Sequence, residues 1–241
     1  MEAIKIAYLA DYKSQEIIKS RNLDYSLAGN NKAKSIIECI EKTDMDVILI
    51  SPASNNSRSF KFYGLEKGKV SCSDIVYTPF ISFPFINLFS SMVFVTLYLL
   101  FMIVGGKYNR ILFYNHSPKF VVPSLIMKFL FDIPIYVEYE DSYFRGAKRI
   151  TKRIYGFFLE TVTNRVIDGA ILVNSFYVDN VRTKNIVICR GFAKRLAHTR
   201  DRDLYDKEIR IGYTGGLDDI RGIDTFVNSA MKFPMEIDGK K

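Results

Sequence analysis

The chain has 241 residues, of which 48% are hydrophobic and 25% are charged, so it can bury a core and is not intrinsically disordered. Its formal net charge of +8 indicates an anionic partner: a nucleic acid, an acidic membrane surface or a phosphorylated small molecule. Three well-separated cysteines and two distant histidines exclude a CxxC metal or redox site and a histidine-rich metal cluster.

Short apolar runs alternate with longer helical patterns along most of the chain. Strands are predicted at 3–10, 46–53, 110–118, 133–141, 169–175 and 185–191. Helices are predicted at 31–43, 122–132, 146–166 and around 176–182. Near-continuous hydrophobic strands are typical of a sheet that helices cover on both faces. The predicted fold class is therefore α/β, with a Rossmann-like parallel sheet, and residues 1–13 read as the first strand of a cytosolic domain without a signal peptide.

The segment 192–208 is polar, carries both charges and lacks a long apolar face, which indicates an interdomain connector. We therefore expect an N-terminal domain over 1–195, a linker over 196–208 and the start of a second domain over 209–241. About forty residues are too few to bury an α/β core alone. The second domain is thus expected to be incomplete within these residues.

The stretch IRIGYTGGLDDIRGID, residues 209–224, indicates a strand, a glycine turn and a helix that begins near Ile223. Gly215 and Gly216 permit backbone conformations that other residues avoid, and a helix N-terminus favours an anion. Arg221 can add a bidentate contact to a phosphate. An ordinary βα turn, with glycines for tight geometry, explains the same residues equally well.

The same stretch resembles the opening of the donor-binding domain in retaining glycosyltransferases of the GT-B fold, of the family 4-like group that includes capsule and O-antigen enzymes. Residues in register with that family's pattern are Gly215, Leu217, Gly222, Ile223 and Asp224. Arg221 keeps the charge of the family's usual lysine. Gly216 replaces a family arginine, which removes one of two expected contacts to the donor diphosphate.

Earlier stretches are similar to the same family in the same order: 27–40 with Gly29 at its turn, 111–118, 136–146, 170–181, and 185–192 with Arg190 before Gly191. The resemblance implies a nucleotide-sugar donor, a lipid-linked saccharide acceptor and retention at the anomeric carbon, in surface polysaccharide synthesis. It implies that Gly29, Gly215, Gly216 and Arg221 bind the donor diphosphate, without an obligatory metal.

The family's later Glu-x7-Glu stretch has no counterpart in these residues. We therefore expect little or no sugar transfer by this chain alone. The rival interpretation is a non-catalytic membrane-docking subunit, or a fragment, that needs a companion chain to complete the donor site.

Acidic side chains follow the strand predicted at 133–141, where open α/β sheets place their ligands. Glu138 and Glu140 lie on one face of that strand by alternation, and Asp141 follows them. These carboxylates are candidates for binding a sugar hydroxyl or acting as a base, or they cap the next helix and pair with Arg145 and Lys148. His116, at the end of another strand, is a further catalytic candidate, although a lone histidine is more often structural.

Two stretches indicate a membrane surface. The segment 83–106 has no charged residue and is long enough to span a bilayer, but it lies between strands of one predicted sheet, which favours a helix packed on the domain. Basic residues recur with helical spacing at Arg145, Lys148, Arg149, Lys152 and Arg153, beside the apolar residues Ile150, Ile154, Phe157 and Phe158. This pattern suits peripheral attachment to an anionic membrane, here the inner face of the plasma membrane, although a solvated helix face would show the same charges. No nucleic-acid-binding motif accompanies the basic residues.

Overall fold

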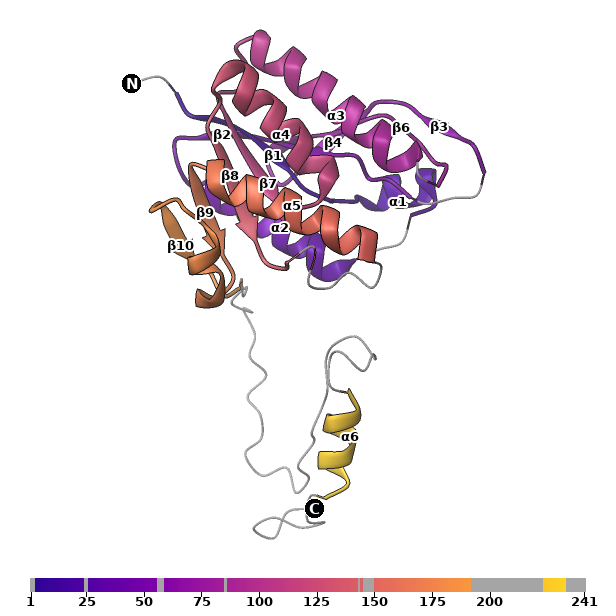
Figure 1. Ribbon diagram of the computed structural model, residues 1–241. Helices are drawn as coiled ribbons and strands as arrows, with labels where there is room; N and C mark the ends of the chain where they lie inside the picture. Colours follow the sequence, from indigo (N-terminus) through magenta and orange to yellow (C-terminus); the bar gives the residue numbers. More distant parts are fainter. Residues whose placement is uncertain are drawn as a thin grey trace. The chain divides into compact units, whose positions relative to one another are not determined.

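A sheet with the strand order β10-β9-β8-β7-β1-β2-β5-β4 forms the centre of the fold (Figure 1). Its strands are β1 (Lys5–Leu9), β2 (Asp46–Ser51), β4 (Glu66–Val70), β5 (Ser73–Tyr77), β7 (Arg110–Tyr114), β8 (Ile135–Tyr139), β9 (Gly169–Leu172) and β10 (Ile186–Ile188). Every neighbouring pair is parallel except β4–β5. The computed structural model describes residues 3–23, 26–55, 59–84, 86–142, 144, 150–191 and 223–232.

The mostly parallel α/β sheet confirms the predicted fold class, and each of the six predicted strands is present as β1, β2, β7, β8, β9 or β10. Buried runs such as Ala7–Leu9 and Val47–Ser51 explain why these strands were recognisable in the sequence. The prediction missed β4 and β5. Because β4 alternates exposed and partly buried residues in the sequence EKGKV, it carries no hydrophobic run.

Helices cover both faces of the sheet (Figure 1). On one face lie α1 (Gln15–Arg21) and α2 (Leu27–Ile40), whose residues Ile17 and Ile37 pack in a core with Tyr8 of β1. On the other face lie α3 (Ile86–Val104), α4 (Pro118–Phe131) and α5 (Ile150–Val166). Leu99 and Val121 of that layer are fully buried. Burial of each such aliphatic side chain contributes roughly 1.5–3 kcal/mol.

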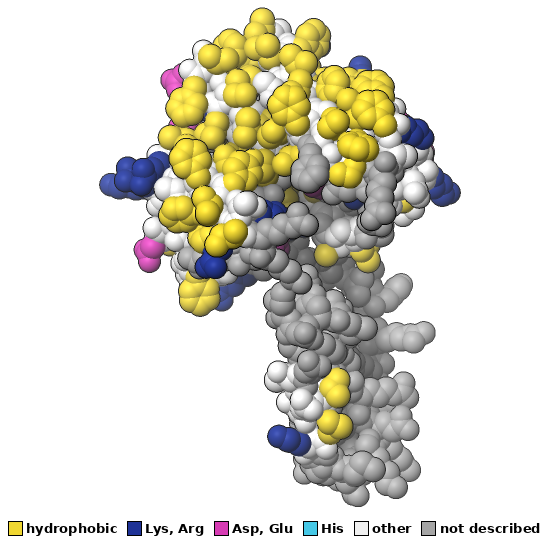
Figure 2. Space-filling view, turned by 45° about the vertical axis from the view of Figure 1, so that its right-hand side comes forward, with side chains coloured by type: hydrophobic (Ala, Val, Ile, Leu, Met, Phe, Trp, Pro, Cys, Tyr) yellow, Lys and Arg dark blue, Asp and Glu magenta, His cyan; other side chains and the backbone are white. Residues whose placement is uncertain are grey.

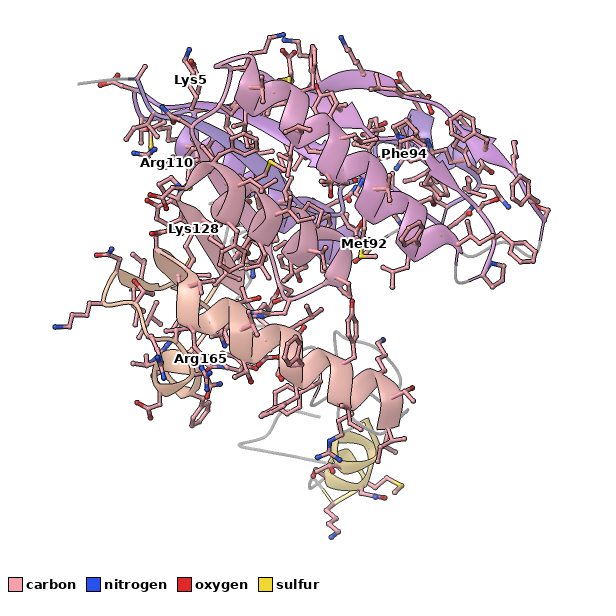
Figure 3. All side chains as sticks on the ribbon, turned by 45° about the horizontal axis from the view of Figure 1, so that its top comes forward. Lys5, Met92, Phe94, Arg110, Lys128 and Arg165 are labelled. Atoms are coloured by element: carbon pink, nitrogen blue, oxygen red, sulfur yellow. The ribbon has the colours of Figure 1, made fainter. Side chains whose placement is uncertain are left out.

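The helix α3 is the crossover between the two halves of the sheet. It follows β6 (Phe80–Ile81), which pairs with β3 (Phe62–Tyr63) in a small separate sheet, and it leads into β7. α3 packs against α4 and β6. Phe94 of α3, labelled in Figure 3, has its ring centroid 6.0 Å from that of Phe62. Most of the apolar segment 83–106 thus forms a helix that packs on the domain. This is the arrangement that its position between predicted strands favoured over a membrane span.

Polar contacts, some of them buried, join the outer helices to the strands and to the loops between them. Lys128 of α4, labelled in Figure 3, lies 3.2 Å from the carboxylate of Asp168, which also accepts a 2.8 Å hydrogen bond from the backbone N–H of Ile135. On the opposite face, the fully buried Arg21 donates to the carbonyls of Pro52 and Gly64. These bonds satisfy backbone groups of irregular segments that would otherwise be buried without partners.

The chain divides into two compact units, Met1–Phe192 and Ala193–Lys241. Within the second unit the structure describes α6 (Ile223–Ala230), which begins at the residue predicted for the helix after the glycine turn. The predicted linker 196–208 and the turn itself lie outside the described residues.

Candidate active site at the carboxyl edge of the sheet

The order of the strands places a switch point between β1 and β7. From β1 the chain moves to β2 and β5 on one side, and after α3 it returns to β7 on the other side of β1. Loops that follow the two strands therefore diverge and leave a crevice at their carboxyl ends. Open α/β sheets bind their ligands in this crevice.

An ammonium group held by two carboxylates lies at this edge. Lys32 Nζ, on α2, is 2.8 Å from Glu138 Oε1 and 3.0 Å from Glu140 Oε2. Glu138 is the penultimate residue of β8 and is almost fully buried, whereas Glu140, just after the strand, is partly exposed. Both carboxylates reach the same ammonium because strand residues two apart point to the same face.

Two tyrosines complete this cluster. Tyr8 of β1 donates a 2.6 Å hydrogen bond to Glu138 Oε2, and Tyr114 of β7 donates a 2.5 Å hydrogen bond to Glu140 Oε2. The side-chain oxygen of Asn115 accepts the backbone N–H groups of Glu140 (2.8 Å) and Asp141 (3.0 Å), which fixes the turn after β8. Strands β1, β7 and β8 and helix α2 thus each supply part of one site.

Burial sets the protonation of the cluster. It raises the pKa of the Glu138 carboxyl, and the neighbouring Lys32 ammonium offsets this only in part. Burial also lowers the pKa of Lys32, but the two carboxylates outweigh it and hold that pKa above its ordinary value. The pKa of Tyr114 is raised by burial and by Glu140. The tyrosines are therefore hydrogen-bond donors, Lys32 is a cation, and Glu138 is a carboxylate that can take up a proton.

A second ion pair lies on the other side of the crevice. Lys119 Nζ, in the first turn of α4, is 2.5 Å from Asp11 Oδ2 and 2.6 Å from Asp11 Oδ1, in the loop after β1. A cavity of about 20 Å³ is lined by Tyr8, Ala10, Asp11, Gly29, Ala33 and Tyr114. A cavity of this size can hold one water molecule beside the Asp11 carboxylate.

Gly29 lies in the first turn of α2, where its backbone N–H donates to the side chain of Ser26 at 3.3 Å. It is the predicted phosphate-binding residue that the structure brings to this edge. The predicted turn residues Gly215, Gly216 and Arg221 lie outside the described residues.

The predicted basic stripe is described only in part. Lys152 and Arg153 are exposed on α5, whereas Arg145, Lys148 and Arg149 lie outside the described residues. Asp141 is exposed beside Glu140, and the Glu140 carboxylate lies 3.0 Å from Lys32 Nζ on α2.

The structure places His116 away from the carboxylates. Its Nε2 lies 2.8 Å from Asn164 Oδ1 of α5, and its ring packs edge-on against Tyr139. Glu138 and Tyr139 are successive strand residues, so they point to opposite faces of the sheet. Complete burial lowers the pKa of His116 to about 4, although the bond to Asn164 acts in the other direction. His116 is thus a neutral core histidine beneath α5 rather than part of the crevice.

Several residues of the site were not predicted. Tyr8, Asp11, Lys32, Tyr114 and Lys119 were passed over because tyrosines in apolar runs resemble core residues and single lysines on helices resemble solvated ones. One signal was available: Tyr8 and Tyr114 occupy the ends of two strands that a parallel sheet places at the same edge. Among the described residues no group of three or more His, Cys, Asp or Glu side chains is arranged to hold a metal ion.

No protein-family model matches the chain, and no curated protein matches it in sequence. Two solved structures of sucrose-phosphate synthase from Thermosynechococcus elongatus are similar to it in fold. The first has a TM-score of 0.48 and 9% identity over 77% of this chain, and the chain spans only 48% of that structure's length. The second has a TM-score of 0.46 and 11% identity, over 77% of this chain and 88% of the other. Likeness at this level carries no information about the substrates of the chain.

Proposed function

We propose that the protein is a glycosyltransferase of the GT-B type, and that the domain described here binds the sugar acceptor. The observation that carries the proposal is the Lys32–Glu138–Glu140 cluster at the switch point of the sheet, where a ligand's hydroxyl groups would meet fixed carboxylates. The ordered resemblance of residues 209–224 and of the earlier stretches to retaining family 4-like enzymes supports it.

In this proposal a nucleotide-diphospho-sugar donates its sugar to a lipid-linked saccharide in surface polysaccharide synthesis. The bond between the anomeric carbon and the diphosphate oxygen breaks, and a bond to the acceptor's hydroxyl oxygen forms with retention. Glu140 or Asp141 takes up the proton of that hydroxyl, the electron pair of the broken bond leaves with the nucleoside diphosphate, and Lys32 and Tyr114 hold Glu140 in position. Gly215, Gly216 and Arg221 bind the leaving diphosphate, without an obligatory metal or cofactor.

The acceptor's lipid places the reaction at the cytoplasmic face of the plasma membrane, with the protein attached peripherally. A companion chain that contributes to the donor site is part of the proposal. A nucleic-acid partner is not proposed.

Sugar transfer in membranes from cells that produce the chain tests this function. Radiolabelled nucleotide-sugars are supplied with a polyprenyl-diphosphate-linked saccharide, and the labelled lipid product is measured. Lys32→Met is expected to lower transfer at least about 100-fold, because Glu140 loses its position and Glu138 is left buried without its cation. Glu16→Gln, a charge change at an exposed position on α1, is the control. Equal transfer by wild type and Lys32→Met, with both folded, would contradict a role of this cluster.

A further inference from the structure

The helix α3 is apolar on its outer side as well as on its buried side. Its exposed residues Ile86, Phe89, Val93, Leu97, Phe101 and Val104 are spaced by three or four positions and so form one stripe. Phe89 and Phe101 are each 64% exposed. A helix that is hydrophobic on all sides is normally covered on all sides, in a protein core or in a membrane.

The apolar surface continues over the neighbouring helices. α4 packs against both α3 and α5. At the ends of this layer lie the exposed Phe129 and Leu130 of α4 and the exposed apolar residues of α5: Ile150, Ile154, Phe157 and Phe158. We call the exposed apolar residues of α3, α4 and α5 named here the outer helical face. Figure 2 shows hydrophobic side chains gathered over one side of the molecule, with lysine and arginine near its margins.

The charges beside the outer helical face are mostly basic, with Asp132 just after α4 and Asp74 beside Leu97 and Phe101 as acidic exceptions. The sequence from Ser142 to Leu159 contains five basic residues and no acidic one, and Phe83–Gly106 contains no charge at all. Lys152 and Arg153 are exposed on α5, and Lys107, just after α3, places its ammonium 5.4 Å from the centre of the Phe101 ring. A partner that covers this face must therefore be apolar in its centre and negatively charged at its border.

We infer that the outer helical face lies flat on an anionic lipid bilayer, with α3 parallel to the membrane plane. A lipid surface offers both features at once, since acyl chains cover the apolar stripe and phosphate headgroups meet the cations. A second copy of the chain fits less well, because a symmetric dimer would set the basic end of each α5 against the same surface of its partner.

This arrangement brings the candidate active site to the membrane. α3 leads into the beginning of β7 and α5 follows the end of β8, so both helices begin at the carboxyl edge of the sheet. Lys152 and Arg153, in the first turns of α5, lie at that edge. If the proposed function holds, the lipid of the acceptor stays in the bilayer while its saccharide extends to the Lys32 cluster at this edge. The docking itself does not depend on that function.

Single tryptophans can test the orientation, because the sequence contains none. Phe89→Trp, Leu97→Trp and Phe101→Trp place an indole along the α3 stripe, and Leu27→Trp places one at an exposed position on α2, on the other side of the sheet. Each full-length variant is mixed with vesicles of phosphatidylglycerol and phosphatidylcholine. We expect the tryptophan emission to shift to the blue at positions 89, 97 and 101 and to stay unchanged at position 27. Lipids brominated at one depth should quench the emission at 89, 97 and 101 to the same extent.

Other outcomes overturn the inference. Deepest quenching at 97 would mean that α3 spans the bilayer, since that position lies near the centre of the helix. Emission at 89 and 101 that is blue-shifted in buffer and unchanged by vesicles, from a dimeric protein, would assign the face to a second copy. Equal emission shifts at all four positions, or no shift at any, would show that the outer helical face is not the surface that binds lipid.

As an independent measure, Leu97→Ser/Phe101→Ser should lower vesicle binding at least about ten-fold, whereas Leu27→Ser/Val187→Ser should not. The inference fails if the Leu97→Ser/Phe101→Ser variant binds like wild type.

Discussion

His116 shows how a single buried residue sets the pH dependence of the domain. Its pKa is lowered from 6.5 to about 4 in the folded state, so the unfolded chain takes up the proton more readily. Its contribution to stability is complete above pH 6.5 and is lost as pH falls from 6.5 towards 4. Between pH 7 and pH 5 this amounts to about 2 kcal/mol of unfolding free energy.

His116→Gln is therefore expected to flatten the dependence of stability on pH over that interval. A glutamine can still hydrogen-bond to Asn164 but does not titrate. Urea unfolding at pH 7 and pH 5 measures the difference. His198→Gln, a change at the only other histidine of the chain, is the control and should keep the wild-type dependence. If the unfolding free energy of His116→Gln depends on pH as steeply as that of the wild type, other groups cause the loss of stability in acid.

Site residues could be predicted only where local sequence carries the information. Glu138 and Glu140 were identified because a strand's end and its alternation are both visible in the sequence EYED. Their partner Lys32 lies more than a hundred positions away, and nothing in its neighbourhood distinguishes it from a solvated lysine. His116 was expected in the crevice because it follows a predicted strand. The structure directs its side chain to the other side of the sheet, where it contacts Asn164 of α5, and this tertiary contact is not visible in the local sequence.

At the scale of elements, the helix α5 combines exposed cations with exposed apolar side chains. Phe157 and Phe158 are more than half exposed, and Phe157 packs against Phe144 with ring centroids 5.3 Å apart. Its inner residues Leu159 and Thr163 are buried against the sheet. α5 is thus anchored by one side, and its exposed charges can be changed without loss of the fold.

Lys152→Glu/Arg153→Glu is expected to lower binding to anionic vesicles by at least about ten-fold, since each basic residue near such a surface contributes roughly 1 kcal/mol and its reversal adds repulsion. Vesicle flotation measures this loss, which should diminish at high salt. Lys34→Glu/Lys42→Glu makes the same change in net charge at a half-buried position on α2 and an exposed position just after it, on the other side of the sheet, and should bind as wild type does. An equal loss of vesicle binding in both variants would show that net charge, and not the position of the residues on α5, causes the effect.

The elements most readily predicted were those that the parallel sheet buries. The strands β1, β2, β7 and β8 are apolar along most of their length, and the helix between 83 and 106 has no charge to interrupt it. The antiparallel β4 was missed because an edge strand with one solvated face reads as a polar segment. The short helix α1 was also missed, because its seven residues include only two isoleucines and therefore show no clear apolar period.

At the scale of the whole molecule, the position of α3 in the chain limits how the proposed membrane contact can be made. α3 is the helix among the described residues that is long and apolar enough to cross a bilayer. However, β1 and β2 precede it, β7 follows it, and β7 pairs with β1 from Ile6↔Arg110 to Leu9↔Phe113. A crossing would place paired strands on opposite sides of the bilayer and break the centre of the sheet.

We therefore expect the membrane-bound protein to be released by alkaline carbonate. In-plane attachment depends in part on lysine ammonium groups that contact the headgroups, and this part is lost when lysines deprotonate at alkaline pH, whereas a spanning helix stays in the lipid. Membranes from cells that produce the chain are washed with carbonate and sedimented, and the protein is measured in both fractions. The same chain fused to a separate spanning helix should remain in the pellet. If the unfused protein also stays there until detergent is added, α3 crosses the membrane and the sheet described here cannot be its membrane-bound form.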